Sequence, residues 1–191
     1  MMRMLLAIGS LLVLTAVASA HAPAGTSIHE GLLHPLSAGS HLLAMIAVGL
    51  WAAQSGGRAT WAWPLCFVTI MTCGSLLAVS DISVPFVEPG ILTSILVLGL
   101  MITFASKLHV AAGASLIAVF ALLHGYMHGV MLAADIQALR FLVGLSLATA
   151  SLHIAGITVV ALCKRLAAPW ATQALGALTL FAGFSLLFTH A

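Results

Sequence analysis

Histidine is the residue whose type and spacing point most directly to chemistry in this chain. The sequence contains nine His against four Asp and Glu in 191 residues. Two pairs stand out, because His34 and His41 lie seven residues apart in one apolar stretch and His124 and His128 lie four apart in another. In a helix, both spacings place the two imidazoles on one face. Neutral imidazole is the commonest protein ligand of transition metals, so the pairs predict a metal site.

Further candidate ligands lie near these pairs or near the start of the chain. His153 sits in a later apolar stretch, and Met127 and Met131 flank His128. Imidazole with thioether is a soft ligand set that favours Cu(I). His21 would add a free amine to its imidazole if the mature chain began there. Each candidate has an alternative role, since a lone buried His is often hydrogen-bonded to a neighbouring helix and Met fills gaps in cores.

Composition indicates what kind of protein carries these histidines. Apolar residues make up 62% of the chain and charged residues 5%, with a mean hydropathy of +1.21. A soluble domain has about 25% charged residues. These proportions exclude a soluble enzyme, a disordered chain and a nucleic-acid-binding protein, which would need basic patches. We therefore expect a multi-pass protein of the lipid bilayer.

The apolar segments predict an all-α membrane protein with six transmembrane helices in one bundle. Residues 1–20 have a basic start, an apolar run and the ending Ala18-Ser19-Ala20, which is typical of a cleavable signal peptide; an uncleaved helix is the alternative. Residues 21–191 then form a single domain, because the connectors are too short for a second one. The predicted spans are Leu33–Ala53, Trp61–Ser80, Gly90–Ser106, His109–Met131, Ala138–Cys163 and Trp170–Phe188.

The distribution of charge predicts the orientation of these spans. Cleavage places the mature N-terminus outside, and six spans then place the C-terminus outside as well. In that topology the inner connectors hold four of the five mature Lys and Arg, which are Arg58, Lys107, Lys164 and Arg165. The positive-inside rule therefore favours an orientation with both termini outside. The four Trp fall at inner span ends, where an aromatic belt is expected.

The helical rise places the two His pairs at matching depths. Because the first span runs inward and the fourth runs outward, His34 falls level with His128 and His41 falls level with His124, in the outer half of the membrane. His153 falls near the midplane of the fifth span. Together these residues predict a ladder of imidazoles that leads inward from the outer surface.

Small residues and cysteines have predicted packing roles. Gly125 and Gly129 form a G-x-x-x-G pattern, which lets a neighbouring helix approach closely. Cys66, Cys73 and Cys163 are too few for a disulfide framework and are expected to behave as small buried hydrophobes, the first two being weak ligand candidates.

The three His-containing stretches, taken in order, resemble the HupE/UreJ family of hydrogenase- and urease-accessory nickel permeases. The first runs from His34-Pro35 through His41, the second is His124-Gly125-x-x-His128-Gly129, and the third is Ala148-Thr149-x-x-Leu152-His153-x-x-Gly156. The resemblance covers nearly the whole mature chain. It implies a permease of the bacterial inner membrane, not an enzyme, that moves Ni²⁺ from the periplasm towards the cytoplasm, with Co²⁺ or copper as alternatives. It also implies no permanently bound cofactor, and metalloenzyme maturation proteins as partners.

Two positions depart from the family pattern. Ser40 stands where the pattern has Asp before the second His, and Met131 stands where it has Glu, so no carboxylate remains in any predicted span. A divalent ion held by imidazoles alone leaves its charge uncompensated in a low dielectric. Three alternatives to a nickel permease therefore stay open: a Cu(I) transporter with His and Met ligands, a membrane metal-binding or assembly protein that does not transport, and a haem protein.

Overall fold

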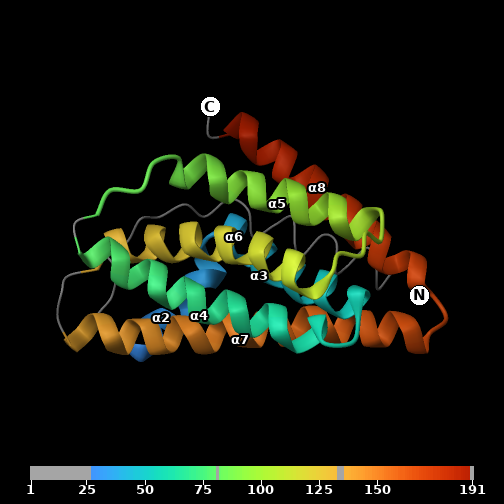
Figure 1. Cartoon of the computed structure of the whole chain (residues 1–191), viewed down its shortest axis with the longest axis horizontal. Helices are drawn as coiled ribbons and strands as arrows, with labels where there is room; N and C mark the ends of the chain where they lie inside the picture. Colours follow the sequence, from blue (N-terminus) through green and yellow to red (C-terminus); the bar gives the residue numbers. More distant parts are fainter. Residues whose placement is uncertain (1–26, 81, 133–135, 190–191) are drawn as a thin grey trace.

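The computed structural model describes residues 27–80, 82–132 and 136–189, and all secondary structure in these ranges is helical (Figure 1). The predicted all-α class is confirmed for the described part of the chain. The predicted signal peptide and His21 lie outside the described residues. The seven described helices are α2 (Ile28–Ser37), α3 (Gly39–Ser55), α4 (Ala59–Val79), α5 (Val87–Thr103), α6 (Val110–Val130), α7 (Ile136–Arg165) and α8 (Pro169–Thr189).

The long helices run in alternating directions along one bundle. The main packing partners are α4 with α6, α5 with α8, and α7 with both α2 and α3. Figure 1 shows α5 and α8 on one side of α6 and α3, with α4 and α7 on the other side. Helix α3, which carries His41, lies against α7, which carries His153, whereas α6, which carries His124 and His128, packs mainly against α4.

Four of the described helices, α4, α6, α7 and α8, are long and apolar enough to cross a membrane. The pair α2 and α3 passes the same test together as one bent span, whereas α5 is a shorter apolar helix of 17 residues. The described chain thus has four or five candidate spans, which supports a multi-pass membrane protein. The predicted number of six is not confirmed.

The first predicted span, Leu33–Ala53, is wrong as a single straight helix. Helix α2 ends at Ser37, one extended residue follows, and α3 begins at Gly39 with the two helices at 90°. At this end of α2 the Ser37 hydroxyl donates to the His34 carbonyl oxygen at 2.7 Å, and the backbone turns at Ala38. Consequently His34 and His41 do not share a face of one helix; they belong to two helices that meet at a corner.

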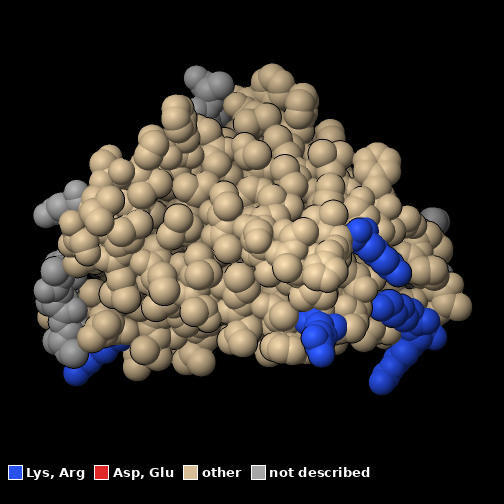
Figure 2. All heavy atoms as spheres, in the orientation of Figure 1, with Lys and Arg blue, Asp and Glu red and all other residues tan. Residues whose placement is uncertain are grey.

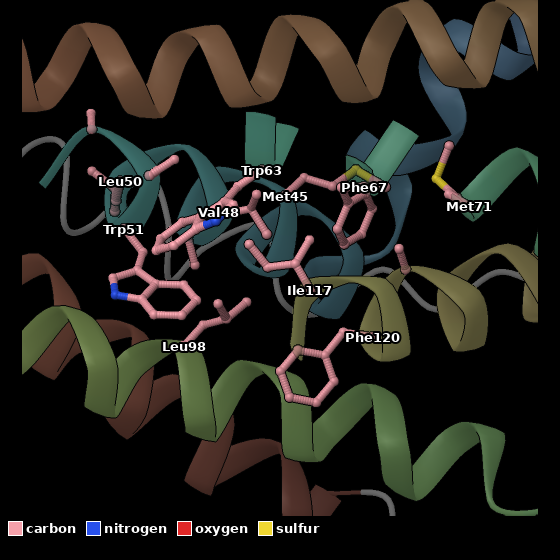
Figure 3. Packing of buried hydrophobic residues seen from close by; sticks show 14 of the residues in the cluster. Met45, Val48, Leu50, Trp51, Trp63, Phe67, Met71, Leu98, Ile117 and Phe120 are labelled. Carbon is pink, nitrogen blue, oxygen red and sulfur yellow. The ribbon is translucent and has the colours of Figure 1, made fainter. Parts of the chain in front are cut away.

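The largest buried cluster of apolar side chains draws on α3, α4, α5, α6 and α7, and Figure 3 shows part of it. Trp51 and Trp63 are fully buried there, with ring centres 4.3 Å apart. Their indole N–H groups donate at 2.8 and 2.9 Å to carbonyl oxygens at the connection between α5 and α6. The predicted aromatic belt is therefore wrong for these two Trp, because a satisfied indole N–H allows the ring to be buried. Trp61 and Trp170 are exposed.

Four of the five described basic side chains gather at one end of the bundle, and Arg140, near the start of α7, is the exception. Arg58, Lys107, Lys164 and Arg165 lie at the connections from α3 to α4, α5 to α6 and α7 to α8. In the view of Figure 2 most of the visible basic atoms lie at this end, which is on the right. The distribution follows the charge pattern that the sequence places on the inner connectors.

Candidate metal-ion site

Four imidazoles from three helices meet at the end of the bundle that is remote from the four basic residues. They are His34 of α2, His41 of α3, and His124 and His128 of α6, and we call them the four-histidine cluster. The His128 ring centre lies 4.9 Å from that of His34 and 4.6 Å from that of His41, and His41 lies 5.2 Å from His124. Three of the four are buried, and His34 is half-buried. The shortest separation joins His41 to His128, so the rings do not form two separate level pairs; the predicted depths of His34 and His41 assumed a straight first span, which the 90° bend excludes.

Close packing of α6 against α4 holds two of these imidazoles in place. A Cβ atom added at Gly125 would overlap the Met71 carbonyl oxygen, and one at Gly129 would overlap the Ser75 carbonyl oxygen. This is the close approach that the G-x-x-x-G spacing predicts. With α6 held against α4 in this way, the face carrying both imidazoles is turned towards α2 and α3. The 90° bend before α3 then brings its first turn, which carries His41, to that face.

The ring nitrogens of the cluster have the chemistry of metal ligands. Nδ1 of His124 lies 2.9 Å from the Phe120 carbonyl oxygen, and because a carbonyl can only accept, Nδ1 carries the proton and Nε2 carries the lone pair. Metal-binding histidines are usually oriented by such a bond to their second nitrogen. Within the described chain, Nε2 of His41, Nε2 of His124 and both ring nitrogens of His128 are buried without a hydrogen-bond partner. A cation would satisfy these atoms.

The distances between the rings suit a shared cation, but the rings are not oriented with their nitrogens towards one common point. Two imidazoles on one tetrahedral metal have ring centres about 5 Å apart, given metal–nitrogen bonds of about 2 Å. The measured separations run from 4.6 to 5.2 Å, with ring planes crossing at 48–83°. In the described ranges, no three His, Cys, Asp or Glu side chains are already arranged so that they could hold a metal ion. Cation binding at the cluster therefore requires the rings to turn about their side-chain bonds.

A fifth imidazole lies one phenylalanine ring further along the bundle. Phe67 of α4 is fully buried, and its ring centre lies 5.6 Å from His124 and 5.1 Å from His153. Nδ1 of His153 bonds the Met45 carbonyl oxygen of α3 at 2.7 Å, while its Nε2 has no partner in the described chain. The interhelical bond considered as the alternative role of His153 is thus present, and the second nitrogen is still available. No feature of the sequence pointed to Phe67.

The described carboxylate nearest to the cluster in sequence is Glu30, one helical turn before His34 on α2, and its Oε2 accepts a hydrogen bond from the Ser27 backbone N–H at 3.3 Å. The acidic residues described are Glu30 and Glu88, both exposed in the first turns of α2 and α5. Ser40, which occupies the position of the family's Asp, places its hydroxyl 3.3 Å from Nδ1 of His41. The polarity of the cluster therefore comes from imidazole and hydroxyl groups, without an anion among them.

The other predicted ligands fall into three groups. Met127 and Met131 are half-buried next to His128 in the sequence, and His21 lies outside the described residues. Among the cysteines, Cys163 is buried as expected, but Cys73 is exposed, so its predicted burial is wrong. Cys73 sits on the part of the α4 surface that no described helix covers.

Comparisons with known proteins agree with the motifs. A family model described as "HupE / UreJ protein" matches residues 9–186. The chain is 36% identical over 157 residues to "Protein HupE" of Rhizobium leguminosarum bv. viciae, and the match covers 82% of each chain. No solved structure matches.

Proposed function

The chain belongs to the HupE/UreJ family, and from this premise together with the four-histidine cluster we propose that it is a metal-ion permease whose route begins at these imidazoles. Members of this family are transporters or accessory proteins rather than enzymes, and membership supports metal transport as the general activity. The observation that carries the proposal is the set of buried, unpartnered nitrogens on His41, His124 and His128. An unpaired polar group in a membrane protein is costly, and such groups are typical of ion pathways.

The proposed route runs from the four-histidine cluster towards the basic end of the bundle. His34 is the half-buried member, so it would meet the arriving ion first. His128 contacts both His34 and His41, and His41 contacts His124, which makes a chain of short steps between rings. Phe67 separates His124 from His153, so transfer to His153 requires this ring to move aside. The positive-inside rule orients the route from periplasm to cytoplasm, in a bacterial inner membrane with both termini outside.

The resemblance to nickel permeases makes Ni²⁺ the first ion to test. Ni²⁺ accepts imidazole ligands readily. Co²⁺ and copper are the alternatives, and the replacement of the family's carboxylates by Ser40 and Met131 favours an ion of lower charge. The proposed partners are proteins of metalloenzyme maturation that take the ion on the inner side.

Metal flux into proteoliposomes tests the proposal. Purified protein is reconstituted, and Ni²⁺, Co²⁺ and copper entry is followed with an enclosed fluorescent chelator. We expect flux in the wild-type protein, and a loss of at least about tenfold in His128→Ala and His124→Ala, as for changes around metal ligands. His29→Ala is the matched control, because His29 is an exposed residue of α2 outside the cluster. Equal flux in all four proteins would overturn the proposed route.

The same experiment separates transport from storage. If the wild-type protein binds the metal in equilibrium dialysis and the liposomes show no flux, the chain is a membrane metal-binding protein that serves a partner. Absence of a haem absorption band in the purified protein eliminates the haem alternative.

A further inference from the structure

A second group of ligand atoms lies beside His153, on buried side chains outside the four-histidine cluster. The Thr149 hydroxyl of α7 lies 3.5 Å from Sδ of Met45 on α3 and 3.7 Å from Sδ of Met71 on α4. All three side chains are fully buried. Two thioethers from different helices thus converge on one hydroxyl in the interior of the bundle.

The direction of the Thr149 hydroxyl distinguishes it from other threonines of the described helices. Five of those donate to the carbonyl four residues earlier in their own helix, namely Thr72, Thr93, Thr103, Thr158 and Thr179. That local bond is the usual way for a threonine in a membrane helix to satisfy its hydroxyl. Thr149 points instead at the two sulfurs, which are weak acceptors. Helix packing alone does not require the Thr149 hydroxyl to face these sulfurs rather than the carbonyl oxygen four residues earlier in α7.

His153 contributes an available nitrogen to the same region. It follows Thr149 by one helical turn on α7, so both residues lie on one face. Its Nδ1 is bonded to the backbone carbonyl of Met45, the residue that also supplies one of the sulfurs. Its Nε2 is buried and unpartnered within the described ranges, and the whole side chain is 1% exposed.

Close contact between α3 and α7 fixes this geometry. A Cβ atom at Gly49 would overlap the His153 carbonyl oxygen, and one at Gly156 would overlap the Ile46 carbonyl oxygen. The α3 backbone therefore lies directly on α7 beside His153. Figure 3 shows the side chains of Met45 and Met71 at the end of the core cluster where Phe67 lies.

We propose that Met45 Sδ, Met71 Sδ and His153 Nε2, with the Thr149 hydroxyl between the sulfurs, form an inner binding station for a soft monovalent cation such as Cu(I) or Ag(I). Thioether and imidazole are the ligands that such ions prefer. The station contains no anion, and the free energy of transferring an ion from water into a low dielectric rises with the square of its charge. A monovalent ion is therefore far less costly to hold there than a divalent one. The station rests on the proposed function only for the route by which the ion arrives.

Silver binding tests the station without relying on transport. Ag(I) is the probe, because it is soft, monovalent and not redox-active under these conditions. The protein is used in detergent in a background in which Cys66, Cys73 and Cys163 are replaced by Ala, since thiols would bind silver themselves. X-ray absorption at the silver edge counts the sulfur and nitrogen neighbours of the bound ion. We expect two sulfurs and one nitrogen.

Substitutions then identify the sulfurs. In Met45→Leu/Met71→Leu we expect no sulfur neighbour and an Ag(I) affinity at least about tenfold weaker. The exchange of Met for Leu conserves volume, and each single variant should retain one sulfur neighbour if the double variant proves unstable. Met101→Leu, a half-buried residue packed against the same core, is the matched control and should retain both sulfurs.

Three results would overturn the station. These are silver without sulfur neighbours in the cysteine-free protein, unchanged sulfur neighbours in Met45→Leu/Met71→Leu, and loss of the sulfurs in Met127→Leu/Met131→Leu instead. Metal flux is measured on the same protein in liposomes. Sulfur-bound silver without flux of any metal would refute the permease and retain the station, whereas flux without sulfur neighbours would do the reverse.

Discussion

Replacing His128 by Leu should stabilise the metal-free protein and abolish its response to metal. His128 is the hub of the four-histidine cluster, because its ring contacts those of His34 and His41. It is also the member with both ring nitrogens buried and unpartnered in the described chain. The same two atoms that make it a candidate ligand therefore make it a source of instability when no cation is bound.

The expected size of the effect follows from these two atoms. A buried polar group without a partner costs about 1–3 kcal/mol. Taking the lower end for each nitrogen gives about 2 kcal/mol, and the change of shape from imidazole to Leu offsets about 1 kcal/mol of this. The remaining gain of about 1 kcal/mol corresponds to a rise in Tm of about 2–4 °C for a chain of this size.

Ni²⁺ should reverse which of the two proteins, wild type or His128→Leu, is the more stable. Ni²⁺ at 100 times its Kd stabilises the protein that binds it by about 2.7 kcal/mol, which corresponds to about 5–10 °C in the wild-type protein. His128→Leu should show little or none of this rise. The variant is therefore expected to be more stable than the wild type without Ni²⁺ and less stable with it.

Thermal unfolding in detergent, followed by circular dichroism with and without Ni²⁺, measures both effects. His29→Leu is the control, because this exposed residue lies outside the cluster and should change neither value. A variant that keeps the full Ni²⁺-dependent rise would refute the role of His128 as a ligand. A variant less stable than the wild type in the absence of metal would refute the assignment of its nitrogens as unpaired.

Three further predictions concern the same site. Ser40→Asp adds a carboxylate beside His41 and should raise Ni²⁺ affinity at least about tenfold, with little effect on Ag(I) affinity. Equilibrium dialysis measures both affinities. Equal gains for both ions would contradict the argument that the carboxylate compensates the charge of a divalent ion. Gly125→Ala places a methyl group against the Met71 carbonyl oxygen and should cost about 1–3 kcal/mol by overpacking, seen as a lower Tm at every Ni²⁺ concentration. Ni²⁺ binding should weaken on acidification, because protons compete with the metal for imidazole nitrogens; an affinity in dialysis that acidification leaves unchanged until the protein unfolds would contradict imidazole ligation.

Much of the helical framework could be predicted from the distribution of apolar residues. The predicted ends of the last five segments lie within three residues of the observed helices, because long uncharged runs between short polar connectors leave few other places to begin or end. The sharing of a helix face by His124 and His128 was equally predictable, since it depends only on their spacing within one uninterrupted helix.

The first segment shows where this reasoning stops. Hydropathy gave no sign of the bend between α2 and α3, because both helices are apolar and the break occupies the single residue Ala38. Ala38 has an extended conformation, and the chain turns through 90° there. Even so, His34 and His41 reach the same partner, His128, from two helices rather than from one.

Only the tertiary structure decided which side chains face one another across helices. Phe67 lies between His124 and His153, and the Thr149 hydroxyl lies against the sulfurs of Met45 and Met71. Both arrangements depend on the register of α4 against α6 and of α3 against α7. Glycines set this register, because they permit the backbones to come into contact. Periodicity assigns a residue to a face of its own helix, but it contains no information about the rotation and offset of the neighbour. For this reason the sequence alone identified the histidines as candidate ligands, whereas the phenylalanine and the thioethers became candidates only once the helices were packed.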